Sequence, residues 1–188
     1  MHKFFGHLKT ILIHKWYVFV FCCKCGIPFR GIVHDLSKFS PTEFWESVRY
    51  YTGKSSPINA CKKDKGYSLA WQHHKGHNSH HYQHWTDNYD SGKLSAICMP
   101  LKDTLEMLCD YLGASKAYSR GKATYVDELS WWISERNKSK SMHPVQIEFL
   151  DTVFVYLAEG GKFPKKKYLK KLYFDIKEKY PVKVEVKK

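Results

Sequence analysis

The clearest candidate metal ligands in this sequence are the adjacent residues His34 and Asp35. A neutral imidazole nitrogen and a carboxylate oxygen together suit a borderline divalent metal ion. Adjacent side chains diverge by about 100° on a helix, but both can contact one ion that lies over the end of that helix. Taken alone, the pair is also compatible with a capping Asp beside a buried His. The interpretation therefore depends on the other candidate ligands.

Histidine is concentrated in one short stretch of the chain. More than half of the 11 histidines lie between His73 and His84, in the sequence WQHHKGHNSHHYQHW. Another histidine, His14, lies on the face of a predicted first helix that also carries Ile11 and Val18, so its side chain should point toward the core. Together with His34, the histidines that we predict as metal ligands are His14, His73, His74, His80 and His81.

A second aspartate, Asp110, completes the predicted ligand set. It lies on a predicted helix near Gly113 and Ala114, whose small side chains allow another helix to approach closely. A charged carboxylate is unfavourable to bury without a partner, so a metal ion or a histidine must neutralise it. Asp103 and Glu106 share its face and could support or bridge metal ions. Exposed acids near a helix N-terminus would give the same pattern.

The order H…HD…H…H…D resembles the ligand pattern of the HD-domain metal-dependent phosphohydrolases, an all-helical superfamily. The segment His34-Asp35-Leu36-Ser37-Lys38 is similar to its H-D-x-x-K motif, and this resemblance implies that Lys38 contacts a substrate phosphate. The paired histidines resemble the H-H element of its dinuclear members. The spacing of 20 positions between His14 and His34 is short for two antiparallel helices and a loop, so His7 is an alternative N-terminal ligand.

A narrower resemblance involves the same residues. The segments HDLSKFSPTEF, HHKGHNSHH and CDYLGAS resemble an uncharacterised family of bacterial and phage proteins, from about His7 to Trp132. That family brings no assigned chemistry with it.

The predicted ligands would bind one or two divalent ions, with manganese, iron, zinc, nickel and magnesium as candidates. Such an ion lowers the pKa of bound water toward about 7 and so supplies hydroxide near neutral pH. We therefore predict a metal-dependent hydrolase that acts on a small phosphorylated substrate, a phosphoester or a nucleotide. Asp35 would hold the ions, Lys38 would stabilise developing negative charge, and His81 would be a general acid for the leaving alkoxide.

Two other functions would use the same residues. A non-catalytic nucleotide- or nucleic-acid-binding protein would need only a structural metal ion that is closed by protein ligands. Aromatic residues such as Trp71, Tyr82 and Trp131 could then stack on bases, although the same residues would also suit a core. An iron enzyme that activates oxygen is the third possibility. An open coordination position on the metal ion would distinguish the hydrolase from the binding protein, and the identity of the metal would distinguish the iron enzyme from both.

The net charge of +13 is distributed unevenly. Residues Lys162 to Lys188 contain 11 Lys against only three acids, which gives this end +8 of the total. A basic surface attracts phosphate-rich partners through its long-range field. This end of the chain could therefore bind nucleic acid, or it could simply present a solvated helix face.

The positioning elements are predicted from apolar residues that recur at three- and four-residue steps. We predict an all-α, HD-domain-like fold in one compact domain over residues 1–188, with a basic C-terminal helix and tail at 162–188. Residues 53–66 are predicted to be a polar loop, and the tail after Pro181 alternates like a strand for which the sequence offers no clear partner. Two predicted helices cover residues 3–25 and 32–38. A third begins at Ser40, with a capping box to Glu43, and four more begin at Pro100, near Trp131, at His143 and at Pro164.

Length and composition limit the class of protein. A chain of 188 residues with 43% hydrophobic residues is long enough for one ordinary core. Its six cysteines do not form a disulfide pattern and are predicted to be reduced core residues. No apolar run approaches the roughly 20 residues that span a bilayer. We therefore expect a soluble, cytoplasmic protein without a membrane partner, whose oligomeric state the sequence leaves open.

Overall fold

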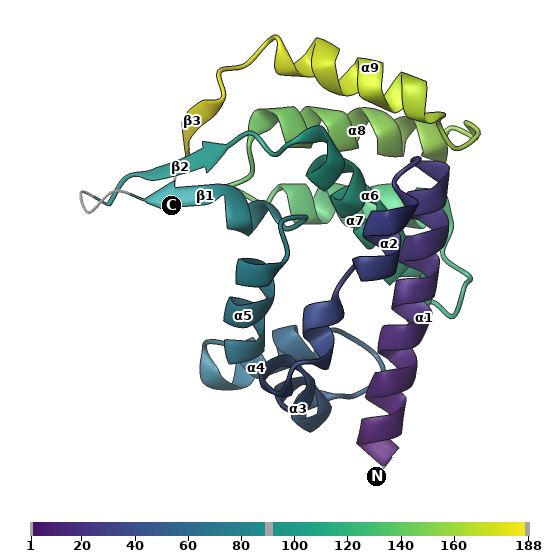
Figure 1. The fold of residues 1–188 in the computed structure, drawn as a ribbon, viewed down its shortest axis with the longest axis vertical. Helices are drawn as coiled ribbons and strands as arrows, with labels where there is room; N and C mark the ends of the chain where they lie inside the picture. Colours follow the sequence, from purple (N-terminus) through teal and green to yellow (C-terminus); the bar gives the residue numbers. More distant parts are fainter. Residues whose placement is uncertain (1, 89–91, 187–188) are drawn as a thin grey trace.

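The computed structural model describes residues 2–88 and 92–186 (Figure 1). Its long helix α1 (His2–Lys24) packs against α6 (Leu101–Tyr118), as the small residues after Asp110 predict. A Cβ atom at Gly113 would collide with the side chain of Val18, so the two backbones approach closely only because this residue is glycine. This contact brings His14 and Asp110 to the same place in the molecule.

The predicted helix over 32–38 is wrong in one respect, because the chain forms two short pieces there. They are α2 (Pro28–Val33) and the 3-10 helix η1 (Leu36–Phe39). Asp35 lies between them with a φ of 54°, in the left-handed region that Asp tolerates better than most residues. The candidate pair His34-Asp35 therefore occupies a break between helical segments.

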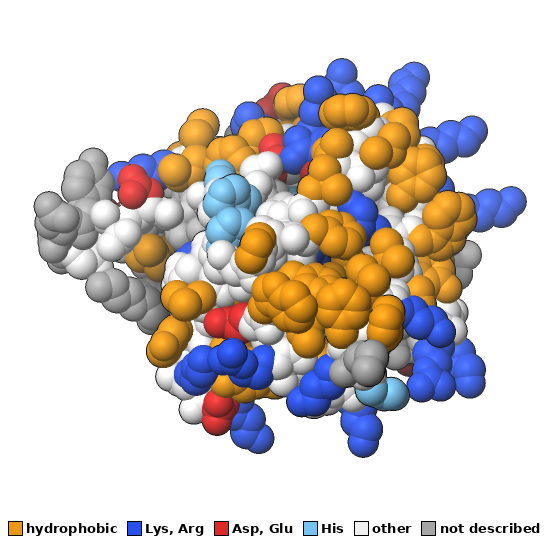
Figure 2. Space-filling model, turned by 60° about the horizontal axis from the view of Figure 1, so that its bottom comes forward, with side chains coloured by type: hydrophobic (Ala, Val, Ile, Leu, Met, Phe, Trp, Pro, Cys, Tyr) orange, Lys and Arg blue, Asp and Glu red, His pale blue; other side chains and the backbone are white. Residues whose placement is uncertain are grey.

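One end of the molecule is built from α3 (Pro41–Tyr50), α4 (Pro57–Lys65) and α5 (Leu69–His77). The predicted loop at 53–66 is wrong for most of its length, because α4 occupies it. Pro57 suits the first helical position, and Gly66 ends the helix with a φ of 81°. Hydrophobic side chains gather on this face of the molecule, and Lys and Arg side chains project along its edge (Figure 2).

The other end contains a small sheet beside the remaining helices. Strands β1 (Thr86–Asn88), β2 (Leu94–Ile97) and β3 (Lys183–Val186) pair antiparallel in the order β1-β2-β3. The sequence predicted the last strand but neither of the other two strands of this sheet. The prediction of a mostly helical single domain is confirmed, and the three short strands are what a purely α-helical description leaves out.

The main core is formed by α1 and α6 together with the helices α7 (Tyr125–Arg136), α8 (Pro144–Ala158) and α9 (Lys166–Lys177). Leu169, Tyr173 and Ile176 of the basic helix α9 are buried in this core, while most of its lysines face outward. The basic C-terminal segment is therefore part of the folded domain. No helix in the described part of the chain is both long and apolar enough to cross a bilayer.

Candidate metal centre

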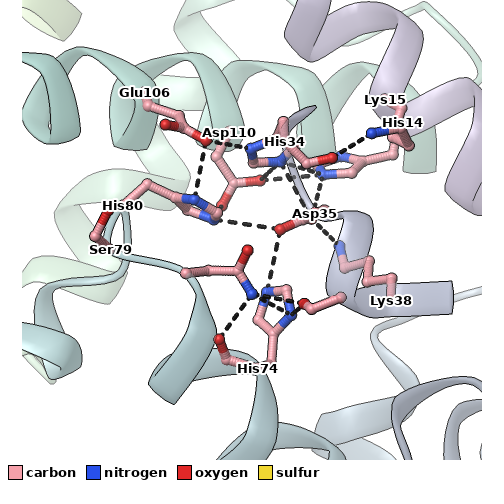
Figure 3. A network of polar contacts seen from close by, with 12 residues as sticks. His14, Lys15, His34, Asp35, Lys38, His74, Ser79, His80, Glu106 and Asp110 are labelled. Carbon is pink, nitrogen blue, oxygen red and sulfur yellow. Dashed lines mark hydrogen bonds and ion pairs between the residues drawn. The ribbon is translucent and has the colours of Figure 1, made fainter. Parts of the chain in front are cut away.

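Four buried side chains from three elements converge at the break after α2 (Figure 3). His14 comes from α1, His34 and Asp35 from the break itself, and Asp110 from α6. His14 Nε2 lies 3.3 Å from Asp35 Oδ2 and 3.1 Å from Asp110 Oδ1. His34 Nε2 lies 3.1 Å from Asp35 Oδ2 and 3.4 Å from Asp110 Oδ1. We call these four residues the first group.

The geometry of the first group matches the size of a metal ion. The two Nε2 atoms of His14 and His34 are 3.3 Å apart, so the measured edges of this tetrahedron run from 3.1 to 3.4 Å. A tetrahedron with edges of about 3.3 Å has its centre about 2.0 Å from each corner, which is the length of zinc–nitrogen and zinc–oxygen bonds. These ligand atoms are therefore spaced closely enough to hold a divalent ion.

A second group uses the other oxygen of the same aspartate. Asp35 Oδ1 lies 3.3 Å from His74 Nε2 and 3.4 Å from His80 Nε2. His81 completes this set of possible ligands. The Nε2 atoms of His80 and His81 are buried and make no hydrogen bond. Because each Asp35 oxygen faces a different group, this carboxylate could bridge two ions.

Glu106 orients one histidine in each group. Its Oε1 atom accepts hydrogen bonds from His34 Nδ1 at 2.9 Å and is 3.2 Å from His80 Nδ1. This leaves both Nε2 atoms directed toward the ligand groups, as metal-binding histidines require. Arg30 in turn binds both Glu106 and Asp103, so the two acids that share a face with Asp110 are fixed by one guanidinium.

Glu43 has the corresponding role for α5. The predicted capping box is only half formed, because Ser40 accepts the backbone N–H of Glu43 but the Glu43 carboxylate points elsewhere. Its two oxygens lie 2.7 Å from His73 Nδ1 and 2.7 Å from His74 Nδ1. The carboxylate therefore fixes the ring of His74 with Nε2 facing Asp35.

The carboxylates of the centre stay charged although they are buried. Burial raises the pKa of Asp110, but hydrogen bonds from His14 and His34 outweigh it and hold that pKa well below its ordinary value. Burial likewise opposes ionisation of Asp35, yet the charges of His34, Lys38 and His74 keep its pKa well below the ordinary value. Two buried carboxylates that remain anionic would attract a divalent cation.

Lys38 contacts the shared ligand. Its Nζ lies 2.6 Å from Asp35 Oδ2, and burial, which lowers the pKa of Lys38, is outweighed by the charges of Asp35 and Asp110, which raise it. The amine is therefore cationic at every physiological pH.

Lys15 donates hydrogen bonds to the backbone carbonyls of Ile32 and His34, which fixes the chain immediately before Asp35.

The ligands reach the wall of a cavity of about 360 Å³. His14, His74, His81, Asp110 and Lys38 all line it, so both groups are accessible from the same space. Ligand pockets for small molecules begin at about this size. A small molecule that enters this cavity would meet both candidate metal positions and the Lys38 amine.

The family model described as "Family of unknown function (DUF5662)" matches residues 3–155. The chain belongs to this family. No curated protein and no solved structure matches the chain. The DUF5662 match contains every candidate ligand and ends before α9, so the basic C-terminal helix lies outside it.

Two predicted residues of this DUF5662 protein are placed away from the centre. In the described segments 2–88 and 92–186, neither His7 nor His73 belongs to a ligand group. His73 binds Glu43 and stacks on His77, with 4.0 Å between ring centroids. His7 packs against Phe44 instead, so the structure brings His14 and not His7 to the cluster.

His81 is better suited to binding a metal ion than to donating a proton. Burial lowers its pKa well below the ordinary value, and the neighbouring His80 and His74 lower it further. A neutral imidazole is the form that coordinates a metal ion, whereas a general acid must carry its proton near the working pH. Sequence reasoning offered both roles for this residue.

Proposed function

We propose that this protein is a metal-dependent phosphohydrolase with a dinuclear centre, in which Asp35 bridges the two groups. The observation that carries the proposal is the position of its two oxygens, with Oδ2 in the first group and Oδ1 in the second. The order of the ligands along the chain, which resembles that of the HD-domain phosphohydrolases, supports the same assignment.

The chemistry follows from the ligands and the cavity. Two divalent ions held there would supply hydroxide near neutral pH and would neutralise charge on a phosphoryl group. His14, His34 and Asp110 would hold the first ion with Asp35, and His74, His80 and His81 would hold the second with the same aspartate. Glu106 and Glu43 keep the coordinating rings oriented. Lys38 lines the cavity beside Asp35, where its cationic amine would stabilise negative charge on a phosphoryl oxygen.

The rival is a binding protein in which the first group holds a structural zinc ion. Such a site is closed by four protein ligands. The cavity favours catalysis, because ligands of both groups and Lys38 line one accessible space. The second group is a further argument, because a single closed zinc site would leave the buried His74 and His80, and the partly buried His81, around an anionic oxygen without a metal ion to bind.

Two substitutions test the proposal because one should remove both metal and activity, whereas the other should remove activity alone. Asp35→Asn should abolish hydrolysis and reduce metal content, since it replaces the shared anionic ligand with a neutral one. Lys38→Ala should retain the metal and lose about 2–4 kcal/mol of transition-state stabilisation, the effect of deleting one donor to a developing oxyanion.

The assay combines metal content with turnover of nucleotides, cyclic nucleotides and simple phosphoesters, in the presence of manganese, zinc, iron, nickel or magnesium. Hydrolysis of a phosphate ester that requires Asp35 would support the proposal. A fully metallated protein that turns over none of these compounds, with its metal closed by four protein ligands, would instead establish the binding-protein function.

A further inference from the structure

Helix α4 forms one side of the cavity that contains the candidate metal ligands. Ile58, Asn59 and Lys62 of this helix line the cavity, at positions three and four residues apart that share one helix face. Lys63 is on a different face and is exposed. The helix therefore directs one specific lysine toward the space in which a substrate would bind.

The charge of Lys62 is not compensated by the protein. No salt bridge joins it to a carboxylate in the described part of the chain, and its Nζ lies 4.5 Å from the centre of the Trp71 ring. The three carboxylates that line the same cavity have other partners, since Glu43 binds two histidines, Asp110 binds His14 and Glu135 binds Lys138. Partial burial lowers the pKa of Lys62, and the charge of Lys75 lowers it further.

Trp71 connects this lysine to the metal centre. Its ring packs edge-to-face on His81, with 5.0 Å between centroids, and lies 6.0 Å from the ring of His74. The ammonium group of Lys62 lies over the same ring. One aromatic side chain thus separates the second group of ligands from a cation that lacks an anionic partner.

We propose that Lys62 and Trp71 form a second anion-binding subsite, and that the substrate is a small molecule with two anionic groups. The phosphoryl group to be cleaved lies at the ligand groups beside Lys38, and the other anionic group lies at Lys62. This inference rests on the proposed phosphohydrolase function. A cavity of about 360 Å³ is suited to a molecule of this kind and is too small for a nucleic-acid strand.

The test uses non-hydrolysable ligands, so that binding is measured without turnover. Alkane bisphosphonates from ethane to hexane are titrated calorimetrically into the metal-loaded protein, alongside the alkyl monophosphonates of matching length. The second phosphonate should improve affinity by about tenfold or more at one chain length, the usual gain from a hydrogen bond to a charged group. Other lengths should show little gain, because the two subsites are fixed.

Two variants on the same helix assign the gain to a residue. Lys62→Met keeps an unbranched chain against Trp71 but removes the charge, and it should reduce the preference for the bisphosphonate to less than about twofold. Lys63→Met removes the same charge from the exposed face and should leave the preference unchanged. Metal content and thermal unfolding should be the same in all three proteins.

The outcomes separate the two proposals. Monophosphonate binding without any preference for a bisphosphonate, or a preference that survives Lys62→Met, would overturn the second subsite and leave the phosphohydrolase function in place. Failure of the metal-loaded protein to bind any phosphonate would overturn the phosphohydrolase function itself, and the subsite with it.

Discussion

Glu106 offers a direct test of how the centre is held together. Its Oε1 atom contacts Nδ1 of His34 and Nδ1 of His80, which belong to different ligand groups. Replacing this acid with Gln removes the anionic partner of both rings while conserving the shape of the side chain. The substitution should therefore weaken the binding of both ions, although Glu106 lies outside the two four-residue groups.

The expected magnitude follows from the number of histidines affected. Removing the carboxylate partner of a metal-bound histidine lowers metal affinity by about 10- to 100-fold, which is about 1.4–2.7 kcal/mol. In Glu106→Gln, one histidine of each ligand group loses its carboxylate partner, so the affinity for each ion should fall within this range. Arg30 also loses a charged partner, which destabilises the fold independently of the metal.

Asp103→Asn is the matched control for that second effect. Asp103 is buried on the same helix and binds the same arginine, but it contacts no ligand histidine. Metal affinity is measured by competition with a chromophoric chelator, and stability is measured by urea unfolding of the metal-free proteins. If Asp103→Asn weakens metal binding as much as Glu106→Gln does, or if Glu106→Gln binds both ions like the wild type, the orienting role assigned to Glu106 is wrong.

Three shorter predictions concern the fold and the basic helix. Burial raises the pKa of Glu128 from 4.5 to about 7, so the folded state binds an extra proton between these values and stability should fall by about 3 kcal/mol as pH rises through them. Urea unfolding from pH 4 to 8 should show this fall in the wild type and not in Glu128→Gln. Gly113→Ala should cost about 1–3 kcal/mol because its Cβ collides with Val18, whereas Gly76→Ala, which meets no neighbouring atom, should be neutral or stabilising in the same assay. Replacing the exposed Lys167 and Lys170 of α9 with Ala should flatten the salt dependence of duplex DNA binding by about 0.9 per lost phosphate contact, and an unchanged slope would identify a solvated helix face.

The sequence identified the ligand types more readily than the groups that orient them. His34, Asp35 and Asp110 were predictable because a buried carboxylate near histidines requires a cation or a proton. Glu106 was only one of two acids with the right helical spacing, and Glu43 had the position of a capping residue. Both contact histidines that are 26 or more positions away in the chain. Helical periodicity reports which residues share a face of one helix, and it does not report which loop returns to that face.

The remaining errors have local causes. Strands β1 and β2 are only three and four residues long, so their alternation is too short to distinguish from a loop. Helix α4 contains few apolar residues, and residues 53–66 also carry Gly and Ser, so the polar composition favoured a loop.

The break at Asp35 explains why one dipeptide can serve two ligand groups. On a continuous helix the side chains of His34 and Asp35 would diverge by about 100°, and only an ion over the helix end could contact both. The helix ends at Val33, His34 has a non-helical backbone, and the left-handed Asp35 that follows has its carboxylate between the two groups. Residues held in this region of backbone space carry about 1–3 kcal/mol of strain and persist where surrounding contacts fix them. Here Lys15 fixes the preceding carbonyls and Lys38 contacts the carboxylate. A mononuclear site would need only one Asp35 oxygen, so the position of both oxygens beside candidate ligands supports the proposed pair of ions.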